Sequence, residues 1–244
     1  MIEIKNLHKS FGGQQVLCGA NLVIPAGQVT VILGPSGSGK TVMLRHIIGL
    51  LRPDRGQILV DGKDVNQLSS VELNQFRRRF GMLFQQAALF DSMNVLENVA
   101  FPLREQRKYT EVEIRDRVHK KLELVGLKDV DEKMPAELSG GMRKRVGLAR
   151  AIALSPEIIL YDEPTTGLDP LMTEVIDNLI VAMQRELQVT SVVISHDVMS
   201  TFRIADRIAM LSEGKIVQFG TQEEFRNSKQ KVVQDFLQLG GKAL

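Results

Sequence analysis

An eight-residue segment, Gly34–Thr41 (GPSGSGKT), carries side chains and glycines suited to binding phosphate. It fits the pattern G-x-x-x-x-G-K-[ST], in which glycines let the backbone wrap closely around an anion and offer it N–H groups. Lys40 can reach the β- and γ-phosphates of a nucleotide, and the hydroxyl of Thr41 suits a Mg²⁺ ligand. The residues predicted to surround the phosphates are Gly34, Pro35, Ser36, Gly37, Ser38, Gly39, Lys40 and Thr41.

Two acids, Asp162 and Glu163, end an apolar run at Ile158–Tyr161. Such a run predicts a buried parallel strand, and ligands bind at the carboxyl ends of strands in open α/β sheets. Asp162 is predicted to hold Mg²⁺ directly or through water, and Glu163 to take a proton from an attacking water. The alternative is a solvated turn, but the phosphate-binding segment upstream favours catalysis.

A second glycine-containing segment, Leu138–Met142 (LSGGM), is typical of a helix start. Ser139 is a good N-cap, while Gly140 and Gly141 expose backbone N–H groups ahead of a basic, helix-forming stretch. This segment is therefore predicted to be a second anion site that lacks a nucleotide of its own.

The elements that must position these residues alternate in type. An apolar run ends at Leu33, just before the phosphate segment, and residues spaced as in a helix follow it, so the dipole of that helix points at the anion. In the charge-rich stretch 104–137, Ile114, Val118, Leu122 and Val125 recur at helical spacings of 4, 4 and 3. Strands are predicted at Ile2–Ile4, Asn21–Ile24, Gln28–Leu33, Gln57–Val60 and Ser191–Ser195, with a closing hairpin at 208–219.

The sequence resembles the ATP-binding subunits of ABC transporters over nearly its whole length. The family's motifs occur in order as Phe11 (A-loop), Gly34–Thr41 (Walker A), Gln85 (Q-loop), Leu138–Met142 (signature), Leu160–Glu163 (Walker B), Gly167–Asp169 (D-loop) and His196 (H-loop). The resemblance implies an α/β P-loop NTPase fold: a RecA-like core (1–85 and 156–220) with an antiparallel β-subdomain, an inserted helical subdomain (86–155) and a short helical tail (221–244).

The resemblance also implies the ligands, ATP and Mg²⁺, and roles for further residues. Phe11 is expected to stack on adenine, although a core aromatic is the alternative. Gln85 is expected to contact Mg²⁺ and the attacking water and to link the site to a permease, and His196 to contact the γ-phosphate. The catalytic residues are therefore predicted to be Lys40, Gln85, Glu163 and His196, and the metal ligands Thr41, Gln85 and Asp162.

A second copy of the chain is the first partner that the resemblance implies. Ser139, Gly140 and Gly141 are expected to bind the nucleotide held by the other copy, so that two ATP molecules are buried in a head-to-tail dimer. Asp169 of the D-loop is also expected to bind nucleotide. Met142 stands where the family most often has Gln. The residues that carry the phosphate contacts are unchanged, so activity is expected to persist.

Met142 also points to a subgroup. Residues 87–93 (AALFDSM), 94–101 (NVLENVAF) and 139–145 (SGGMRKR) resemble ATPases of Mla-type phospholipid transporters and their chloroplast lipid-import relatives. This implies a subunit that drives an integral membrane permease, moving phospholipid between inner and outer membranes, together with a lipid-binding accessory subunit. An ATPase for a small-solute transporter is the main alternative, and a soluble ABC ATPase acting on DNA or ribosomes is the third.

Apolar side chains after Gln85 are candidates for the groove that receives the permease, since exposed apolar patches mark partner surfaces. Ordinary core packing is the equal alternative. The residues are Leu89, Phe90, Met93, Val95 and Leu96. In the tail, Val232, Val233, Phe236 and Leu237 form a helical apolar stripe that is expected to dock on the chain's own core.

Composition agrees with a protein at the cytoplasmic face of the inner membrane, attached peripherally. The 244 residues are 43% apolar and 25% charged, with no run near the ~20 apolar residues that span a bilayer. Met1–Ser10 has no signal-peptide pattern, and the single Cys18 fits a reducing compartment. The net charge of +2 does not favour nucleic acid, and the basic run 77–79 is predicted to be a solvated helix face.

Overall fold

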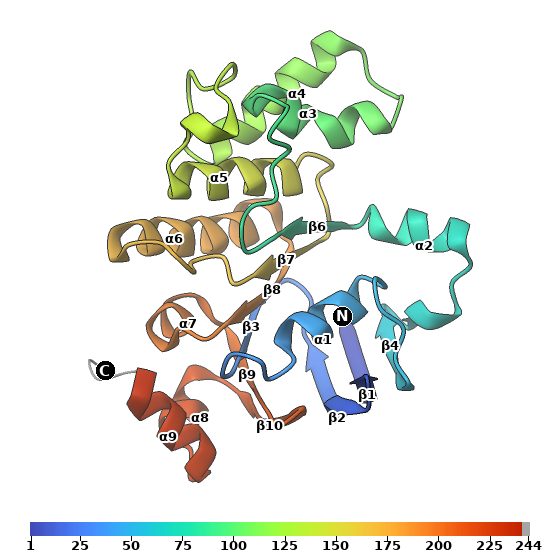
Figure 1. The fold of residues 1–244 in the computed structure, drawn as a ribbon, viewed down its shortest axis with the longest axis vertical. Coiled ribbons are helices and arrows are strands. Elements are labelled where there is room, and N and C mark those ends of the chain that lie inside the picture. The colour runs from blue at the N-terminus through green and yellow to red at the C-terminus, as the bar shows by residue number, and fades with distance from the viewer. Residues whose placement is uncertain (241–244) are drawn as a thin grey trace.

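A six-stranded sheet forms the centre of the computed structural model, which describes residues 1–240 (Figure 1). Its strand order is β10-β9-β3-β8-β7-β6; β10 runs antiparallel to β9, and the other neighbours are parallel. The strands are β3 (Val29–Leu33), β6 (Phe80–Leu83), β7 (Ile158–Asp162), β8 (Thr190–Ser195), β9 (Arg207–Ser212) and β10 (Lys215–Gly220). Strands β3, β7 and β8 are buried at every position, which explains their continuous apolar runs.

The parallel register brings distant segments to one edge of this sheet. Leu33 at the end of β3 pairs with Ser195 of β8, and Asp162 at the end of β7 pairs with Ile194. The residues that follow these strands therefore meet at the carboxyl edge, the expected place for a ligand.

A four-stranded antiparallel sheet lies beside the core, in the order β2-β1-β4-β5. Its strands are β1 (Ile2–Phe11), β2 (Gln14–Ile24), β4 (Arg55–Val60) and β5 (Lys63–Asp64). The first two are much longer than predicted, because Gly12 and Gly13 both take positive φ (55° and 84°) and close a two-residue hairpin. Phe11 and Gln14 pair across that turn, which places Phe11 at the tip of the sheet.

Three helices of the segment between β6 and β7 pack together above the core sheet in Figure 1. They are α3 (Val95–Glu105), α4 (Glu111–Leu124) and α5 (Gly140–Ala151), with a 3-10 turn at Pro135–Glu137. Asn94 and Thr110 begin α3 and α4 with capping boxes, in which a Glu three residues later bonds back to the cap. Ile114, Val118 and Leu122 are buried, as their spacing predicted.

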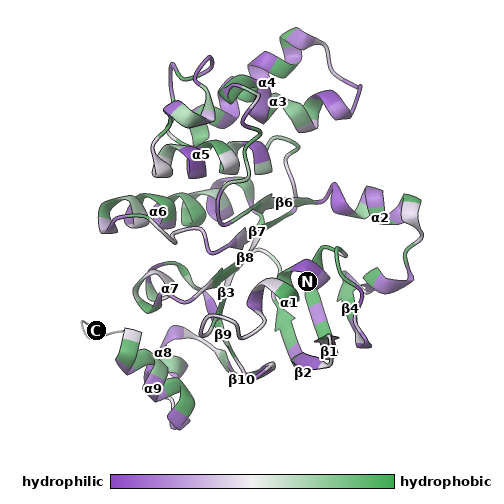
Figure 2. Cartoon of the chain, viewed as in Figure 1, coloured by the Kyte–Doolittle hydropathy of each residue, from purple (hydrophilic) through white to green (hydrophobic). Residues whose placement is uncertain are grey.

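The remaining helices cover the core sheet or follow it. They are α1 (Lys40–Ile47), α2 (Ser70–Arg77), α6 (Pro170–Leu187), α7 (Val198–Ile204), α8 (Gln222–Arg226) and α9 (Lys231–Gly240), with a 3-10 turn at Val65–Gln67. The predicted closing hairpin is confirmed, with Glu213 and Gly214 at positive φ between β9 and β10. In Figure 2 the central strands are mainly green, whereas rim helices such as α2 and α4 alternate green and purple.

One sequence-based interpretation is wrong. Arg77 and Arg79 do not form a solvated face: Arg77 Nη2 donates to the Gly49 carbonyl (2.7 Å), and Arg79 pairs with Asp61 and Glu157. These arginines hold distant segments together, which their adjacency in sequence could not reveal.

For the candidate groove residues, the structure decides between the two alternatives that the sequence left open. Val95 and Leu96 are core residues, 1% and 3% exposed, because the first turn of α3 faces the core of the helical segment. Phe90 remains 41% exposed, and its ring lies 4.8 Å from that of Phe101.

In the tail, Val233 is buried, and Phe236 and Leu237 pack on the chain's own core, as predicted.

Candidate active site

The phosphate segment forms a loop between β3 and α1, and its glycines have different structural roles. Gly37 has φ +80°, and a side chain added there would meet nothing within 4 Å, so this part of the loop is open. A Cβ at Gly34 would instead lie 2.3 Å from the carbonyl oxygen of Leu211 in β9. Gly39 combines φ +100° with close contact to Val16 of β2. Packing against the two sheets therefore fixes the ends of the loop and leaves its middle free.

Lys40 at the start of α1 is only 4% exposed, and its Nζ donates to the carbonyls of Gly34 (2.8 Å) and Pro35 (2.9 Å). Burial lowers the pKa of Lys40, and the charge of Glu163 opposes that shift. Within residues 1–240, the buried hydroxyl of Ser38 has no hydrogen-bond partner. A buried ammonium and an unsatisfied hydroxyl in an anion-binding loop fit the phosphates of a nucleotide.

Thr41 and Asp162 lie together, as expected for two ligands of one metal ion. Thr41 Oγ1 donates to Asp162 Oδ1 at 3.1 Å. Burial raises the pKa of Asp162, while the hydrogen bond from Thr41 lowers it. A bound cation would offset the cost of burying this carboxylate, and carboxylate and hydroxyl oxygens are ligands that Mg²⁺ accepts.

Glu163 lies at the centre of the site and contacts the other residues predicted to be catalytic. Its Oε1 lies 3.7 Å from Lys40 Nζ and 3.4 Å from His196 Nδ1, and its Oε2 accepts from Gln85 Nε2 (3.4 Å). The four residues predicted to be catalytic are thus brought together. Gln85 contacts Glu163, and its role as a metal ligand stays a prediction.

Sequence reasoning missed Thr166, whose Oγ1 donates to Glu163 Oε2 at 3.1 Å. Its hydroxyl lies three residues after Glu163, a spacing at which one turn can bring two side chains together, and this is the signal that could have found it. Thr166 and Gln85 together orient the carboxylate.

The backbone of Glu163 is in the left-handed region, with φ +46°. Non-glycine residues rarely take this conformation, and it persists where surrounding contacts hold it. Here the Glu163 N–H donates to the Ile194 carbonyl (3.1 Å) in β8. Strain of this kind concentrates at functional sites, which agrees with the predicted role of Glu163.

A cavity of about 360 Å³ lies between the phosphate loop and Glu163. Its lining residues are Val16, Ser36, Gly37, Gly39, Lys40, Thr41, Val42, Gln85 and Glu163. Val16 of β2 was not predicted, and it shows that the antiparallel sheet forms one wall.

Phe11 is 46% exposed, so the core-aromatic alternative is wrong. Lys9 Nζ lies 5.4 Å from the centre of its ring, within the range of a cation–π interaction. The ring is accessible for stacking, and its contact with adenine stays a prediction.

Replacing Phe11 with Ala is expected to weaken ATP binding by about 5- to 150-fold, because stacking a base on an aromatic ring contributes about 1–3 kcal/mol. Calorimetric titration with ATP would measure the loss. Phe219→Ala is the control, since Phe219 on β10 is similarly exposed (40%). Equal affinities for Phe11→Ala and the unmodified protein would show that the ring does not bind the base.

The signature segment lies apart from the 360 Å³ cavity. Ser139 begins α5 as predicted, its Oγ accepting from the Met142 N–H at 3.2 Å. Asp169 similarly caps α6, accepting from the Met172 N–H at 2.9 Å. Neither these residues nor Gly140 and Gly141 line the cavity, so one chain does not bring the two anion sites together.

The fold and the site define a P-loop ATPase of the ABC type. Residues 17–166 match the family described as ABC transporter. Curated relatives that are 46% and 50% identical match over 97% of the chain. The chain therefore belongs to the ABC transporter family, and it is an ATP-hydrolysing, Mg²⁺-dependent subunit.

Three relatives illustrate the match. The chain is 46% identical over 237 residues to the intermembrane phospholipid transport system ATP-binding protein MlaF of Haemophilus influenzae, covering 97% of this chain and 90% of that protein. It is 50% identical over 236 residues to a protein of Mycobacterium leprae named "Probable ribonucleotide transport ATP-binding protein mkl", covering 97% of this chain but 68% of that one. The dimeric ATP-binding cassette MJ0796, solved with ADP and Pi, aligns with TM-score 0.83 and 35% identity over 91% of this chain and 98% of its own.

In the described part of the chain, no helix has both the length and the apolar character needed to cross a bilayer.

Proposed function

We propose that this ABC ATPase drives a transporter that moves phospholipid between the inner and outer membranes. The observation that carries the proposal is the match to MlaF, which spans nearly the whole of both chains. Met142 and the surrounding SGGMRKR sequence support the same subgroup. The mycobacterial relative named for ribonucleotide transport supports a small-solute cargo as the second candidate, but it is covered over only 68% of its length.

The proposed assembly contains two copies of this chain, an integral membrane permease and a lipid-binding accessory subunit, at the cytoplasmic face of the inner membrane. The aromatic pair Phe90 and Phe101 supports a docking place for the permease. Both rings are partly exposed, and Phe90 lies in the segment that follows Gln85. Apolar surface of this kind is typical of a partner site.

The site residues work in two stages in this proposal. Phe11, the phosphate loop, Thr41 and Asp162 of one copy hold ATP and Mg²⁺, and Ser139, Gly140, Gly141 and Asp169 of the other copy close over them. Closure changes the state of the permease. Glu163 then accepts the proton of the attacking water, His196 and Gln85 orient the reacting groups, and hydrolysis reopens the dimer.

Mass spectrometry of proteins and lipids that co-purify with the tagged chain from its native host, in mild detergent, tests the cargo. We expect a multispanning permease, a lipid-binding subunit and enriched phospholipid. Purification from the untagged host supplies the background. A permease that arrives with a soluble solute-binding protein and without phospholipid would contradict the lipid cargo, while leaving the ATPase assignment intact.

A further inference from the structure

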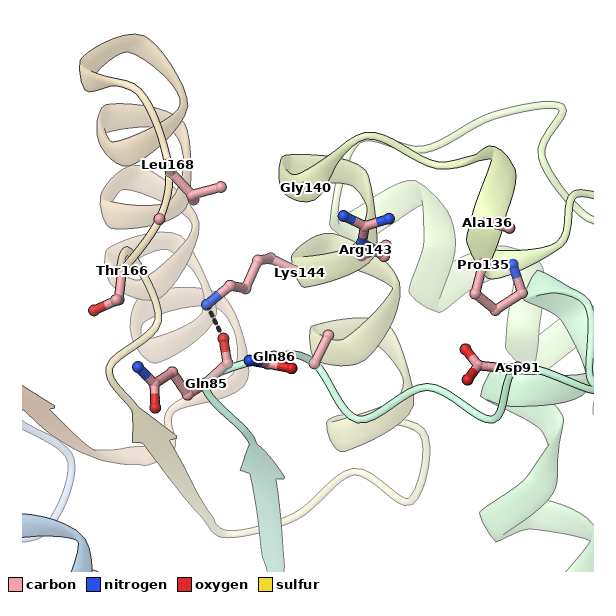
Figure 3. A pocket seen from close by; sticks show the side chains of 12 residues that line it. Gln85, Gln86, Asp91, Pro135, Ala136, Gly140, Arg143, Lys144, Thr166 and Leu168 are labelled. Atoms are coloured by element: carbon pink, nitrogen blue, oxygen red, sulfur yellow. Dashed lines mark hydrogen bonds between the residues drawn. The ribbon is translucent and has the colours of Figure 1, made fainter.

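Lys144, on the first turns of α5, connects the signature helix to the candidate active site. Its side chain is 5% exposed, and its Nζ donates to the backbone carbonyl of Gln85, the bond drawn dashed in Figure 3. The same Nζ lies 3.4 Å from the backbone carbonyl of Glu163. One cation therefore contacts the main chain of two residues whose side chains meet each other beside the phosphate loop.

Lys144 and Gln85 line a cavity of about 570 Å³, together with the segment Thr166–Leu168. In Figure 3 the Lys144 side chain extends from α5 toward Gln85. A second cation of α5, Arg150, donates to the Ala87 carbonyl (2.7 Å). The chain after β6 is therefore bound to α5 at two of its carbonyls, and a shift of α5 is transmitted to Gln85.

Burying the Lys144 ammonium costs free energy of folding, which indicates that this residue has a role other than stabilising the fold. Burial lowers the pKa of its ammonium, while the charges of Asp162 and Glu163 oppose that shift. Burying a cation is costly, and an apolar side chain of similar volume at such a place is often neutral or stabilising. A methionine would fill the same space without this cost but would leave both carbonyls without their donor.

The contact between Lys144 and the Glu163 carbonyl bears directly on the conformation of Glu163. This carbonyl belongs to a residue held at φ +46°, so the main chain at Glu163 is in a restricted conformation, and the carbonyl and the side chain extend from the same constrained Cα atom. The carboxylate must stay within reach of Lys40 and His196 if it is to act as a base. A donor that holds the carbonyl therefore holds the main chain at the Cα atom from which the carboxylate extends.

We propose that Lys144 is a positioning residue for ATP hydrolysis, which ties the orientation of the signature helix to the geometry of Glu163 through the carbonyls of Gln85 and Glu163. This inference rests on the proposed role of Glu163 as the base.

Lys144→Met is expected to lower the ATP turnover number by about 10- to 100-fold, the scale of a misplaced catalytic group, and to change the KM for ATP by less than about 3-fold. Lys121→Met is the matched control. Lys121 on α4 is a half-buried lysine whose pKa is also lowered by burial and whose Nζ donates to Ser155 Oγ (3.2 Å), away from the site. Its turnover should stay within about two-fold of the unmodified chain. An unchanged turnover for Lys144→Met overturns the proposal.

A double-mutant cycle separates positioning from a general structural effect. If Lys144 acts through Glu163, Lys144→Met should have less than about a two-fold effect on the residual turnover of Glu163→Gln. An equal fold-loss in both backgrounds would show that Lys144 acts independently and would refute the coupling. Thermal unfolding checks folding, and Lys144→Gln, whose side chain is uncharged and shorter than that of lysine, replaces Met in the cycle if the Met variant does not fold. A normal turnover for Glu163→Gln alone would instead reject the base assignment.

Discussion

Replacing Glu163 with Gln is expected to lower ATP turnover by about 10²- to 10⁴-fold while leaving ATP affinity nearly unchanged, because general-base assistance contributes a factor of this size. The amide has the size of the carboxylate and can still accept from Thr166, whose hydroxyl lies 3.1 Å from Glu163 Oε2. It cannot accept a proton from water at neutral pH. The variant should therefore bind ATP and stay in the closed dimer.

Two measurements check this expectation. Steady-state phosphate release gives the turnover, and sedimentation with ATP and Mg²⁺ gives the dimer fraction, which should rise above that of the unmodified chain. Glu186→Gln, an exposed position on α6, is the control for the loss of one acidic charge. Turnover of Glu163→Gln within about two-fold of the control would remove Glu163 from the role of base.

Replacing Lys40 with Ala is expected to weaken ATP binding by about 10- to 100-fold, since a hydrogen bond to a charged group contributes about 1.5–3 kcal/mol. The ammonium already lies in the loop, bonded to the carbonyls of Gly34 and Pro35. Its removal takes away the buried positive charge that the phosphates would meet.

Calorimetric titration with ATP and Mg²⁺ measures the Lys40→Ala effect, and Lys215→Ala, at an exposed lysine of β10, is the matched control. The contrast between the two site variants is itself informative. Lys40→Ala should lose affinity, whereas Glu163→Gln should lose turnover. An ATP affinity unchanged by Lys40→Ala would reject the phosphate assignment.

Much of the site could be predicted because its signals are local. The strand, loop and helix around Gly34–Thr41 follow from glycine spacing and from apolar patterns over a few residues. Ser139 caps α5 because a short polar side chain satisfies N–H groups one turn away, wherever the helix lies in the fold. The acids at and just after the end of β7, Asp162 and Glu163, follow in the same way from an apolar run.

By itself, then, the sequence determined the chemistry of the nucleotide site and the local elements that carry it, since these depend on neighbours within one turn or strand. Only the tertiary structure decided that Glu163 lies at the centre of the site and that Val95 and Leu96 are core residues. It also decided that Lys144 reaches the carbonyls of Gln85 and Glu163, which are 59 and 19 positions away in the sequence. The reason is physical: such contacts are set by how strands pair and by how α5 packs over the sheet, and these depend on the burial of the whole chain.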